Sequence, residues 1–346
     1  MPTLKDVARE AGVSKSTVSR LFNDPTRVKD TTREKIEEAV DKLDYQPSRV
    51  ARRLRVQNGR AHLFGLAIPD IQSPFHAEVA RGVENVVRAE GYSLILENCD
   101  EDPEKQRACL RTFQTEDVDG VIVPPVSERD DAVRRLVEGG MPVVCVDRRI
   151  QGVEVDTVVS DNQEGAYQAT RHLIEGGYER IAYLGGIKRI STTRERYEGY
   201  RTALSDAGID EDPALVRYGE SRMESGQRLV EELLDSPEPP TALFAGNDLT
   251  TLGAYVALYE RGLSIPQDMA VVGYDDVPWA LALAPPPTVV RQPGREMGRR
   301  AADMLMRRIT EPDASVTTAT LRPQLVVRAS CGIRKMKPRT DGSART

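Results

Sequence analysis

The chain has 346 residues, of which 39% are hydrophobic and 29% are charged, and its formal net charge is −6. This length predicts two or three domains with ordinary hydrophobic cores. No apolar run approaches the roughly 20 residues that span a bilayer, and no apolar signal segment follows the start, so we expect a cytoplasmic protein. The four cysteines lack the paired spacing of a disulfide or zinc framework, and we expect reduced thiols.

The charge is distributed unevenly along the chain. Residues 1–60 contain 14 basic and 9 acidic residues, a balance of +5, whereas the remainder contains 34 basic and 45 acidic residues, a balance of −11. A basic segment joined to an acidic body indicates a module for a polyanion such as nucleic acid, although a solvated helical surface gives the same charge.

The first 46 residues have the pattern of three short helices. Thr3 and Asp6 have the spacing of a capping box, and Gly12 ends the first helix. Ser14 precedes a second helix that is expected to run from Lys15 to about Asn23. A third helix has its apolar residues at helical spacing around Ile36. Residues 47–60 are expected to form a short hinge helix and a polar linker.

From residue 61 the pattern changes to short apolar runs that alternate with amphipathic stretches. This alternation predicts buried parallel strands and an α/β body. The length of the segment predicts two similar halves that divide near residue 160. The expected strands are Leu63–Ile68, Ser93–Leu96, Gly120–Val123, Val143–Val146, Thr157–Val159, Ile181–Leu184, Ala242–Ala245 and Ala270–Gly273. The expected helices lie near 75–90, 103–116, 128–139, 162–176, 194–207, 222–235, 249–262 and 294–309. Residues 334–346 are expected to form a basic flexible tail.

The stretch from Thr3 to Arg20 has the pattern of a helix-turn-helix. Its second helix presents Lys15, Ser16, Thr17 and Arg20 near the helix N-terminus, where side chains read base edges in the major groove. Ser14 and Ser19 suit phosphate oxygens. A small helical cap with a basic solvated face is the alternative. We also expect DNA contacts from Thr3, Asn23, Arg27, Thr32 and Tyr45.

The same residues, together with Thr32–Ile36 and Leu43–Leu54, resemble the DNA-binding headpiece of the lac repressor (LacI/GalR) family over about 50 residues. The resemblance implies that Ser48 to Leu54 is a hinge that orders when two subunits meet over the operator. It also implies that Leu54 enters the minor groove, where an inserted apolar side chain kinks the duplex. Ser48, Arg49, Ala51 and Arg55 are then expected to contact DNA beside it, although simple packing of Leu54 is the alternative.

The resemblance continues through the body to about Arg328, with similar stretches at Val118–Ile122, Pro240–Asp248 and Val272–Asp276. It implies a periplasmic-binding-protein-like body of two doubly wound parallel-sheet subdomains. The expected domains are a headpiece at 1–46, a hinge and linker at 47–60, and an effector-binding and dimerisation domain at 61–333. Within that domain we expect an N-subdomain at 61–160 with a crossover near 275–292, and a C-subdomain at 161–330.

Polar residues follow several of the expected strands directly. Asp147, Asn247 and Asp275 come after apolar runs, and open α/β sheets bind ligands beyond the carboxyl ends of their strands. Carboxylates and amides bind sugar hydroxyls, and Phe75 after the first strand can pack against a sugar face, with a place in the core as the alternative. For Asn247, capping of the next helix is an equally good interpretation.

By motif position the resemblance implies effector contacts from Phe75, Asp147, Arg148, Arg196, Asn247 and Asp275. Thr192, Arg194, Ser221 and Gln292 are further candidates. Arg148 and Ser221 stand where family members have an aromatic residue, which favours a polar sugar, a sugar acid or a phosphate ester over a flat nucleobase.

The sequence has no nucleotide-binding glycine motif, no nucleophile elbow and no cluster of its three histidines, so we expect neither an enzyme nor a metal site. We expect no cofactor besides a small-molecule effector. The sequence therefore predicts a DNA-binding transcriptional regulator, most simply a repressor, which binds a near-palindromic operator as a homodimer. A sugar-binding protein without regulatory DNA binding, a transport receptor and a Rossmann-type enzyme are the alternatives.

Overall fold

The computed structural model describes residues 2–23, 27–45 and 61–332. The expected hinge helix, including Ser48, Arg49, Ala51, Leu54 and Arg55, and the expected basic tail lie outside these residues. The described chain forms two compact units, one up to Leu63 and one from Phe64 onward. We refer to them as the headpiece and the body.

The headpiece consists of helices α1 (Leu4–Glu10), α2 (Lys15–Asn23) and α3 (Asp30–Leu43). At the start of α1 the Asp6 carboxylate accepts hydrogen bonds from the backbone N–H of Thr3 at 2.8 Å and from its hydroxyl at 2.7 Å. Val7, Val18 and Ile36, one from each helix, are completely buried in a common core. The helices therefore close around a small apolar centre and leave their polar faces outward.

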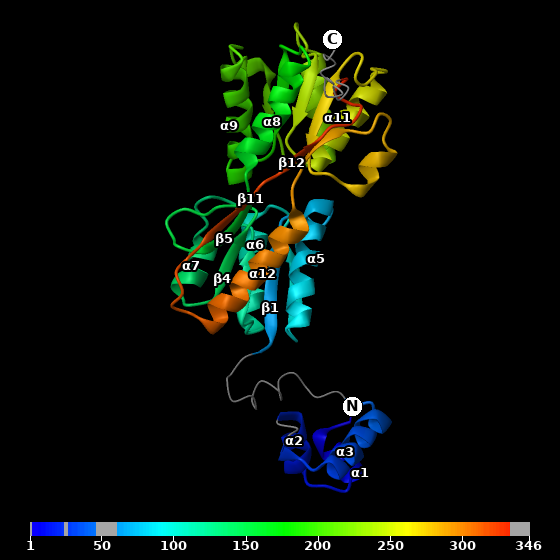
Figure 1. Cartoon of the computed structure of the whole chain (residues 1–346), viewed down its shortest axis with the longest axis vertical. Helices are drawn as coiled ribbons and strands as arrows, with labels where there is room; N and C mark the ends of the chain where they lie inside the picture. Colours follow the sequence, from blue (N-terminus) through cyan, green and yellow to red (C-terminus); the bar gives the residue numbers. More distant parts are fainter. Residues whose placement is uncertain (1, 24–26, 46–60, 333–346) are drawn as a thin grey trace, which may run out of the picture. The chain divides into compact units, whose positions relative to one another are not determined.

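The body contains two six-stranded sheets with matching strand orders. Figure 1 shows the two α/β halves of the body, with β11 and β12 on the chain that runs from one to the other. The first sheet has the order β11-β5-β4-β3-β1-β2 and the second has the order β12-β10-β9-β8-β6-β7. From β11 to β1 in the first sheet and from β10 to β7 in the second, neighbouring strands are parallel, whereas β12 is antiparallel to β10. The strands of the first sheet are β1 (Leu63–Ile68), β2 (Ser93–Asn98), β3 (Gly120–Val123), β4 (Val143–Val146), β5 (Asp156–Ser160) and β11 (Thr318–Leu321). Those of the second are β6 (Ile181–Gly185), β7 (Val216–Tyr218), β8 (Ala242–Ala245), β9 (Ala270–Tyr274), β10 (Thr288–Arg291) and β12 (Gln324–Val326).

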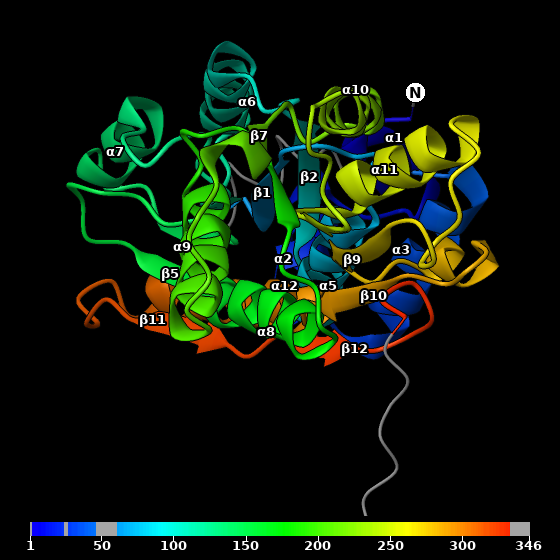
Figure 2. The same ribbon diagram turned by 90° about the horizontal axis from the view of Figure 1, so that it is seen from above.

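Helices cover both faces of each sheet. In the first subdomain these are α5 (Pro74–Ala89), α6 (Pro103–Thr115), α7 (Asp131–Glu138) and α12 (Gly294–Thr310). In the second they are α8 (Asn162–Glu175), α9 (Ser191–Asp206), α10 (Met223–Leu234) and α11 (Asp248–Glu260), with short 3-10 helices at Pro213–Leu215 and Pro278–Ala282. Figure 2 shows α8 beside α9 and α10 beside α11. Among the described residues, none of the helices has the length and apolar character to cross a membrane.

The expected doubly wound α/β class is confirmed, and the eight expected strands and eight expected helices are all present. Four further strands, β7, β10, β11 and β12, were missed. They have three or four residues each, and β7, β11 and β12 are only partly buried, so they lack the continuous apolar runs that identify the others.

The expected limits of the two subdomains need a correction. The C-subdomain was expected to include 161–330, but α12 packs on α5, β3, β4 and β5 of the first sheet, and β11 pairs with β5. The chain thus passes between subdomains three times, after β5, after β10 and after β11. Helical periodicity identifies the apolar face of α12 but not the sheet that it covers.

Two glycines allow α5 and α12 to pack closely. A Cβ placed on Gly298 of α12 would lie 2.0 Å from the backbone oxygen of Val79, and one on Gly82 of α5 would lie 2.1 Å from that of Arg295. Both neighbours are backbone atoms, which cannot rotate away. Glycine is therefore required at this helix crossing.

We expect Gly298→Ala to destabilise the protein by about 1–3 kcal/mol, because overpacking at a backbone contact costs that much. Helix propensity alone would give the opposite sign, a gain of about 1 kcal/mol for alanine over glycine. Urea denaturation of both proteins distinguishes the two effects. A higher midpoint for the variant would contradict the close packing of the two helices.

Candidate functional site

The polar residues that the sequence predicts to read DNA lie on α2 and just before it. The Ser14 hydroxyl accepts a hydrogen bond from the backbone N–H of Thr17 at 3.1 Å and also contacts the hydroxyls of Ser16 and Thr17. Lys15 and Arg20 are exposed, while Val18 and Leu21 of the same helix are buried. Within the described residues neither Lys15 nor Arg20 forms an ion pair, so both charges remain available to a ligand.

The other candidate DNA contacts lie around this helix. Thr3 and Arg27 are exposed, and Ser19 and Thr32 are half-buried. Tyr45 is 7% exposed and its ring centroid lies 6.1 Å from that of Phe22, so it belongs to the headpiece core. Asn23 ends α2. Contacts of these residues with DNA remain predictions.

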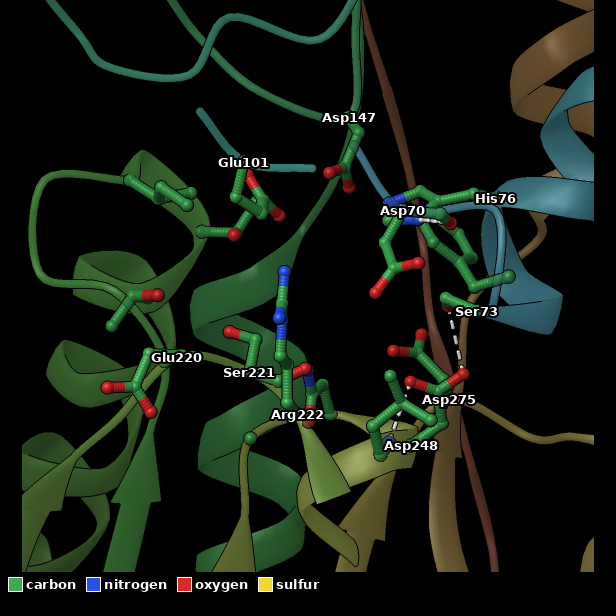
Figure 3. Close-up of a pocket in the computed structure, with 18 of the residues that line it drawn as sticks. Asp70, Ser73, His76, Glu101, Asp147, Glu220, Ser221, Arg222, Asp248 and Asp275 are labelled. Carbon is green, nitrogen blue, oxygen red and sulfur yellow. Dashed lines mark hydrogen bonds between the residues drawn. The ribbon is translucent and has the colours of Figure 1, made fainter. Parts of the chain in front are cut away.

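The body has a cavity between its two subdomains, at the carboxyl ends of the strands (Figure 3). Its empty space is about 700 Å³, counting the part that is open to solvent. Residues of both subdomains line it, including Asp147 and Phe75 from the first and Arg196, Asn247 and Asp275 from the second. The cavity thus contains eight of the ten residues for which the sequence predicts effector contacts, because Arg148, Thr192 and Ser221 line it as well.

Asp147 and Asp275 occupy equivalent positions in the two subdomains. Each follows the fourth strand of its half, each has a left-handed backbone with φ of 69°, and each donates its backbone N–H to the next strand at 2.8 Å. Aspartate tolerates this backbone conformation better than most residues. The two turns therefore direct one carboxylate from each subdomain toward the cavity.

The two carboxylates differ in their bonding. Oδ1 of Asp147 is buried and has no hydrogen-bond partner within the described residues. Oδ1 of Asp275 accepts a hydrogen bond from Gln292 Nε2 at 2.7 Å. Burial raises the pKa of Asp275 to about 7, and the nearby Asp248 adds to this effect while Arg196 opposes it. Asp275 therefore titrates near neutral pH.

Arg196 extends from α9 into the cavity and is 7% exposed. Its Nε donates to Asn162 Oδ1 at 2.9 Å, one Nη donates to the backbone oxygen of Gly246 at 2.5 Å, and its guanidinium lies 3.8 Å from the ring centroid of Tyr274. No carboxylate of the described residues lies within 4 Å of this guanidinium. Its charge is therefore held in place without an ion pair and remains available to ligand oxygens.

Arg148 is positioned by a neighbouring acid. Its two terminal nitrogens bind the Glu101 carboxylate at 2.7 and 2.5 Å. Burial alone would raise the pKa of Glu101, but the charge and hydrogen bonds of Arg148 outweigh it and lower that pKa. Arg148 is thus neutralised in a fork-like pair, and its Nε has no hydrogen-bond partner within the described residues.

Asn247 acts as the N-cap of α11. Its Oδ1 accepts from the backbone N–H of Thr250 at 2.7 Å, and its Nδ2 donates to the backbone oxygen of Ser221 at 3.1 Å. The capping interpretation is therefore correct for this side chain, which leaves one N–H for a ligand. Ser221 itself has a left-handed backbone with φ of 59°.

Two predicted effector contacts lie outside the cavity lining. Arg194 pairs with Glu128 of the first subdomain, because it lies on the opposite side of α9 from Thr192 and Arg196. Gln292 is buried behind Asp275 and supports it through the hydrogen bond described above. The interpretation of both as residues of the cavity wall is corrected accordingly.

Sequence reasoning missed several residues of the cavity. Ser73 donates its hydroxyl to Asp248 at 2.9 Å, which joins the two subdomains. His76 contacts the backbone oxygen of Asp70 at 3.0 Å. The remaining missed residues include Asp100, Glu101, Tyr183, Glu220 and Arg222. Most follow strand ends too, but the sequence does not show which loops approach each other across the cleft.

Comparisons with known proteins identify two family models in the chain. Residues 3–48 match the model described as bacterial regulatory proteins, lacI family, and residues 61–326 match periplasmic binding proteins and sugar binding domain of LacI family. A relative named HTH-type transcriptional repressor PurR, from Mannheimia succiniciproducens, is 35% identical over 332 residues, covering 95% of this chain and 98% of its own.

Two solved structures are also similar. One, described as transcriptional regulator CelR-cellobiose complex, has 35% identity and a TM-score of 0.72, and the match covers 95% of this chain and 100% of that chain. The other, a lac repressor dimer bound to operator and the anti-inducer ONPF, has 28% identity and a TM-score of 0.84, covering 95% of this chain and 99% of that one.

The raised pKa of Asp275 predicts how stability changes with pH. An unfolded aspartate has a pKa of about 3.9, so the folded state holds this proton more tightly and loses stability as the pH rises from about 4 to about 7. Asp275→Asn stays neutral and avoids this loss. We therefore expect the urea midpoint of the wild type to fall relative to that of Asp275→Asn between about pH 5 and pH 8.

Asp235→Asn is the matched control, because Asp235 is exposed and its pKa is lowered by the hydrogen bond from Arg261. Its midpoint should differ from the wild type by the same amount at every pH in this range. Parallel curves for wild type and Asp275→Asn would show that Asp275 is charged throughout and would contradict the raised pKa.

Proposed function

The chain belongs to the LacI family of DNA-binding transcriptional regulators, which a small-molecule effector controls, and we propose that its body binds an uncharged sugar in the cavity between the subdomains. The observation that carries the proposal is the pair of equivalent carboxylates, Asp147 and Asp275, which reach one cavity from opposite sides. Carboxylates accept hydrogen bonds from sugar hydroxyls, and Arg196 between them donates to ring or hydroxyl oxygens.

The charges of the cavity favour a neutral ligand over a sugar acid or phosphate ester. Seven acidic residues and three arginines line it, and Arg148 is already paired with Glu101. An anionic ligand would meet a surplus of negative charge. Phe75 supplies an aromatic surface, as sugar sites commonly do. The cellobiose in the complex of the CelR relative is in line with this ligand class.

We further propose that the chain acts as a homodimer on a near-palindromic operator, most simply as a repressor. Two copies of α2 would read two half-sites in successive major grooves. Effector binding changes operator affinity only if the effector binds the open and closed cleft unequally. A cavity with walls from both subdomains supports this mechanism, because a bound ligand stabilises the closed arrangement more than the open one.

The experiment is a thermal-shift screen of the full chain with ribose, glucose, cellobiose, gluconate, glucose 6-phosphate and adenine. At about 100 times its Kd, a ligand that binds only the folded state adds about 2.7 kcal/mol of stability. We expect a rise in Tm with at least one neutral sugar and none with gluconate, the phosphate ester or adenine. A rise with adenine or only with the anionic compounds would overturn the proposed ligand class.

The sugar that raises Tm then tests Asp147. Asp147→Asn removes the charge of a hydrogen-bond acceptor, and such bonds contribute about 1.5–3 kcal/mol, so its Kd should rise about 10-fold to 100-fold in calorimetric titration. Asp131→Asn, an exposed carboxylate of the same subdomain, is the control and should bind normally. Equal Kd values for both variants would remove Asp147 from the site.

For the headpiece we expect Arg20→Ala to weaken operator binding by about 1–3 kcal/mol and to relax the preferred sequence at one position of each half-site. Selection of bound sequences from a random DNA pool supplies the operator, and a binding titration at about 0.15 M salt supplies the affinities. Lys35→Ala, on the exposed face of α3, is the control. An equal loss on all DNA sequences would indicate a phosphate contact instead of base reading.

A further inference from the structure

The segment Arg189–Arg196, which we call the latch segment, faces both the cavity and the first subdomain. Ile190, Thr192, Thr193 and Arg196 line the cavity. The other four residues of the segment instead contact the first subdomain; they are Arg189, Ser191, Arg194 and Glu195. The segment includes the start of α9, and the 3.6-residue helical turn brings Thr192, Thr193 and Arg196 to the cavity side while Arg194 and Glu195 face the first subdomain.

Arg189 holds two loops of the first subdomain. Its Nη2 donates to the backbone oxygen of Glu101 at 2.6 Å and its Nε donates to that of Val126 at 3.2 Å. The loop at Glu101 is the one that also pairs with Arg148, and its residues Asp100 and Glu101 have left-handed backbones with φ of 50° and 59°. One guanidinium thus connects the second subdomain to two strand-end loops of the first.

Two ion pairs continue the contact. Arg194 binds the Glu128 carboxylate, whose side chain is 23% exposed. Arg149 of the first subdomain lies 3.4 Å from Glu195, and its backbone N–H donates to the Ser191 hydroxyl at 3.2 Å. None of the three arginines lines the cavity. Each contact joins two groups of the protein itself, so it does not require a bound effector.

A chain of hydrogen bonds connects these contacts to the cavity. Asn162 Nδ2 donates to Glu195 at 3.0 Å, and Asn162 Oδ1 accepts from Arg196 Nε at 2.9 Å. Asn162 is the first residue of α8, directly after the first passage of the chain between the subdomains. Arg196, which lines the cavity, is therefore linked through Asn162 and Glu195 to Arg149 on the opposite subdomain.

We propose that Arg149, Arg189 and Arg194, together with Glu128 and Glu195, form a latch that holds the cleft closed, and that Asn162 couples this latch to Arg196. These are positioning residues, because they act on the effector only through the closed arrangement. A ligand that fixes Arg196 also fixes Asn162 and Glu195, and so strengthens the latch. The proposal rests on the proposed function only in taking the cavity as the effector site.

The test measures closure in the full chain without any effector. Glu104 of the first subdomain and Glu238 of the second have side chains that are 74% and 79% exposed, and the four native cysteines are buried. Glu104→Cys and Glu238→Cys therefore accept a pair of fluorescent dyes selectively. Labelled chains are diluted into an excess of unlabelled chains, so that energy transfer reports the distance within one subunit.

We expect Arg189→Ala combined with Arg194→Ala to lower the ratio of closed to open molecules by about fourfold to 25-fold, since each of the two partly exposed contacts contributes a factor of about two to five. Arg261→Ala, which removes a two-bond pair with Asp235 inside the second subdomain, should leave the ratio unchanged. Exchange of the charges in Arg194→Glu with Glu128→Arg should restore the ratio that Arg194→Glu alone reduces.

An unchanged energy-transfer distribution in the double alanine variant, or failure of the charge exchange to restore closure, would overturn the latch. A fall of equal size in Arg261→Ala would do the same, because it would show a general effect of lost surface pairs. Since no effector is present, a wrong sugar assignment does not alter these outcomes. The sugar screen above tests that assignment separately.

Discussion

Both sheets of the body direct the carboxyl ends of their parallel strands into one space, and the arrangement of every polar group in the cavity depends on this constraint. A parallel strand ends with a turn into a helix, so the residues after it are polar and their backbone N–H groups are partly free. Two such edges facing each other concentrate acids, amides and arginines at a single place. The duplicated turn at Asp147 and Asp275 is the clearest result, because the same left-handed residue follows the same strand in both halves.

The buried surroundings of each cavity side chain determine its charge and whether that charge is available to a ligand. Burial raises the pKa of Asp275. The charge of Arg148 is neutralised by Glu101. The charge of Arg196 is not neutralised, because an amide oxygen and a backbone oxygen, and no carboxylate, accept its hydrogen bonds. The two arginines thus have different roles within one cavity, since one is paired with an acid and the other is not. The same principle separates Arg196 from Arg194, which lie two positions apart on α9 but on opposite sides of it.

Much of this arrangement was predictable from the sequence. Strands buried on both faces have continuous apolar runs, so β1, β3, β4, β6, β8 and β9 could be located within one or two residues. Asp147 and Asp275 were recognisable because they follow such runs directly. Short strands such as β7 and β12 carry no comparable signal. The place of α12 and the contacts of Arg189 were not predictable either, because they depend on which distant segments meet in three dimensions.

The return of the chain to the first subdomain after β10 has a consequence for synthesis on the ribosome. The apolar core of that subdomain includes Met297, Ala301 and Leu305 of α12, which are made only after the entire second sheet except β12. Until α12 has been synthesised, which takes most of translation, the nascent chain therefore exposes one apolar face of the first sheet. We expect this face to be the surface that chaperones bind on the emerging chain. We also expect C-terminal truncations that remove α12 to aggregate although they keep every residue that lines the cavity.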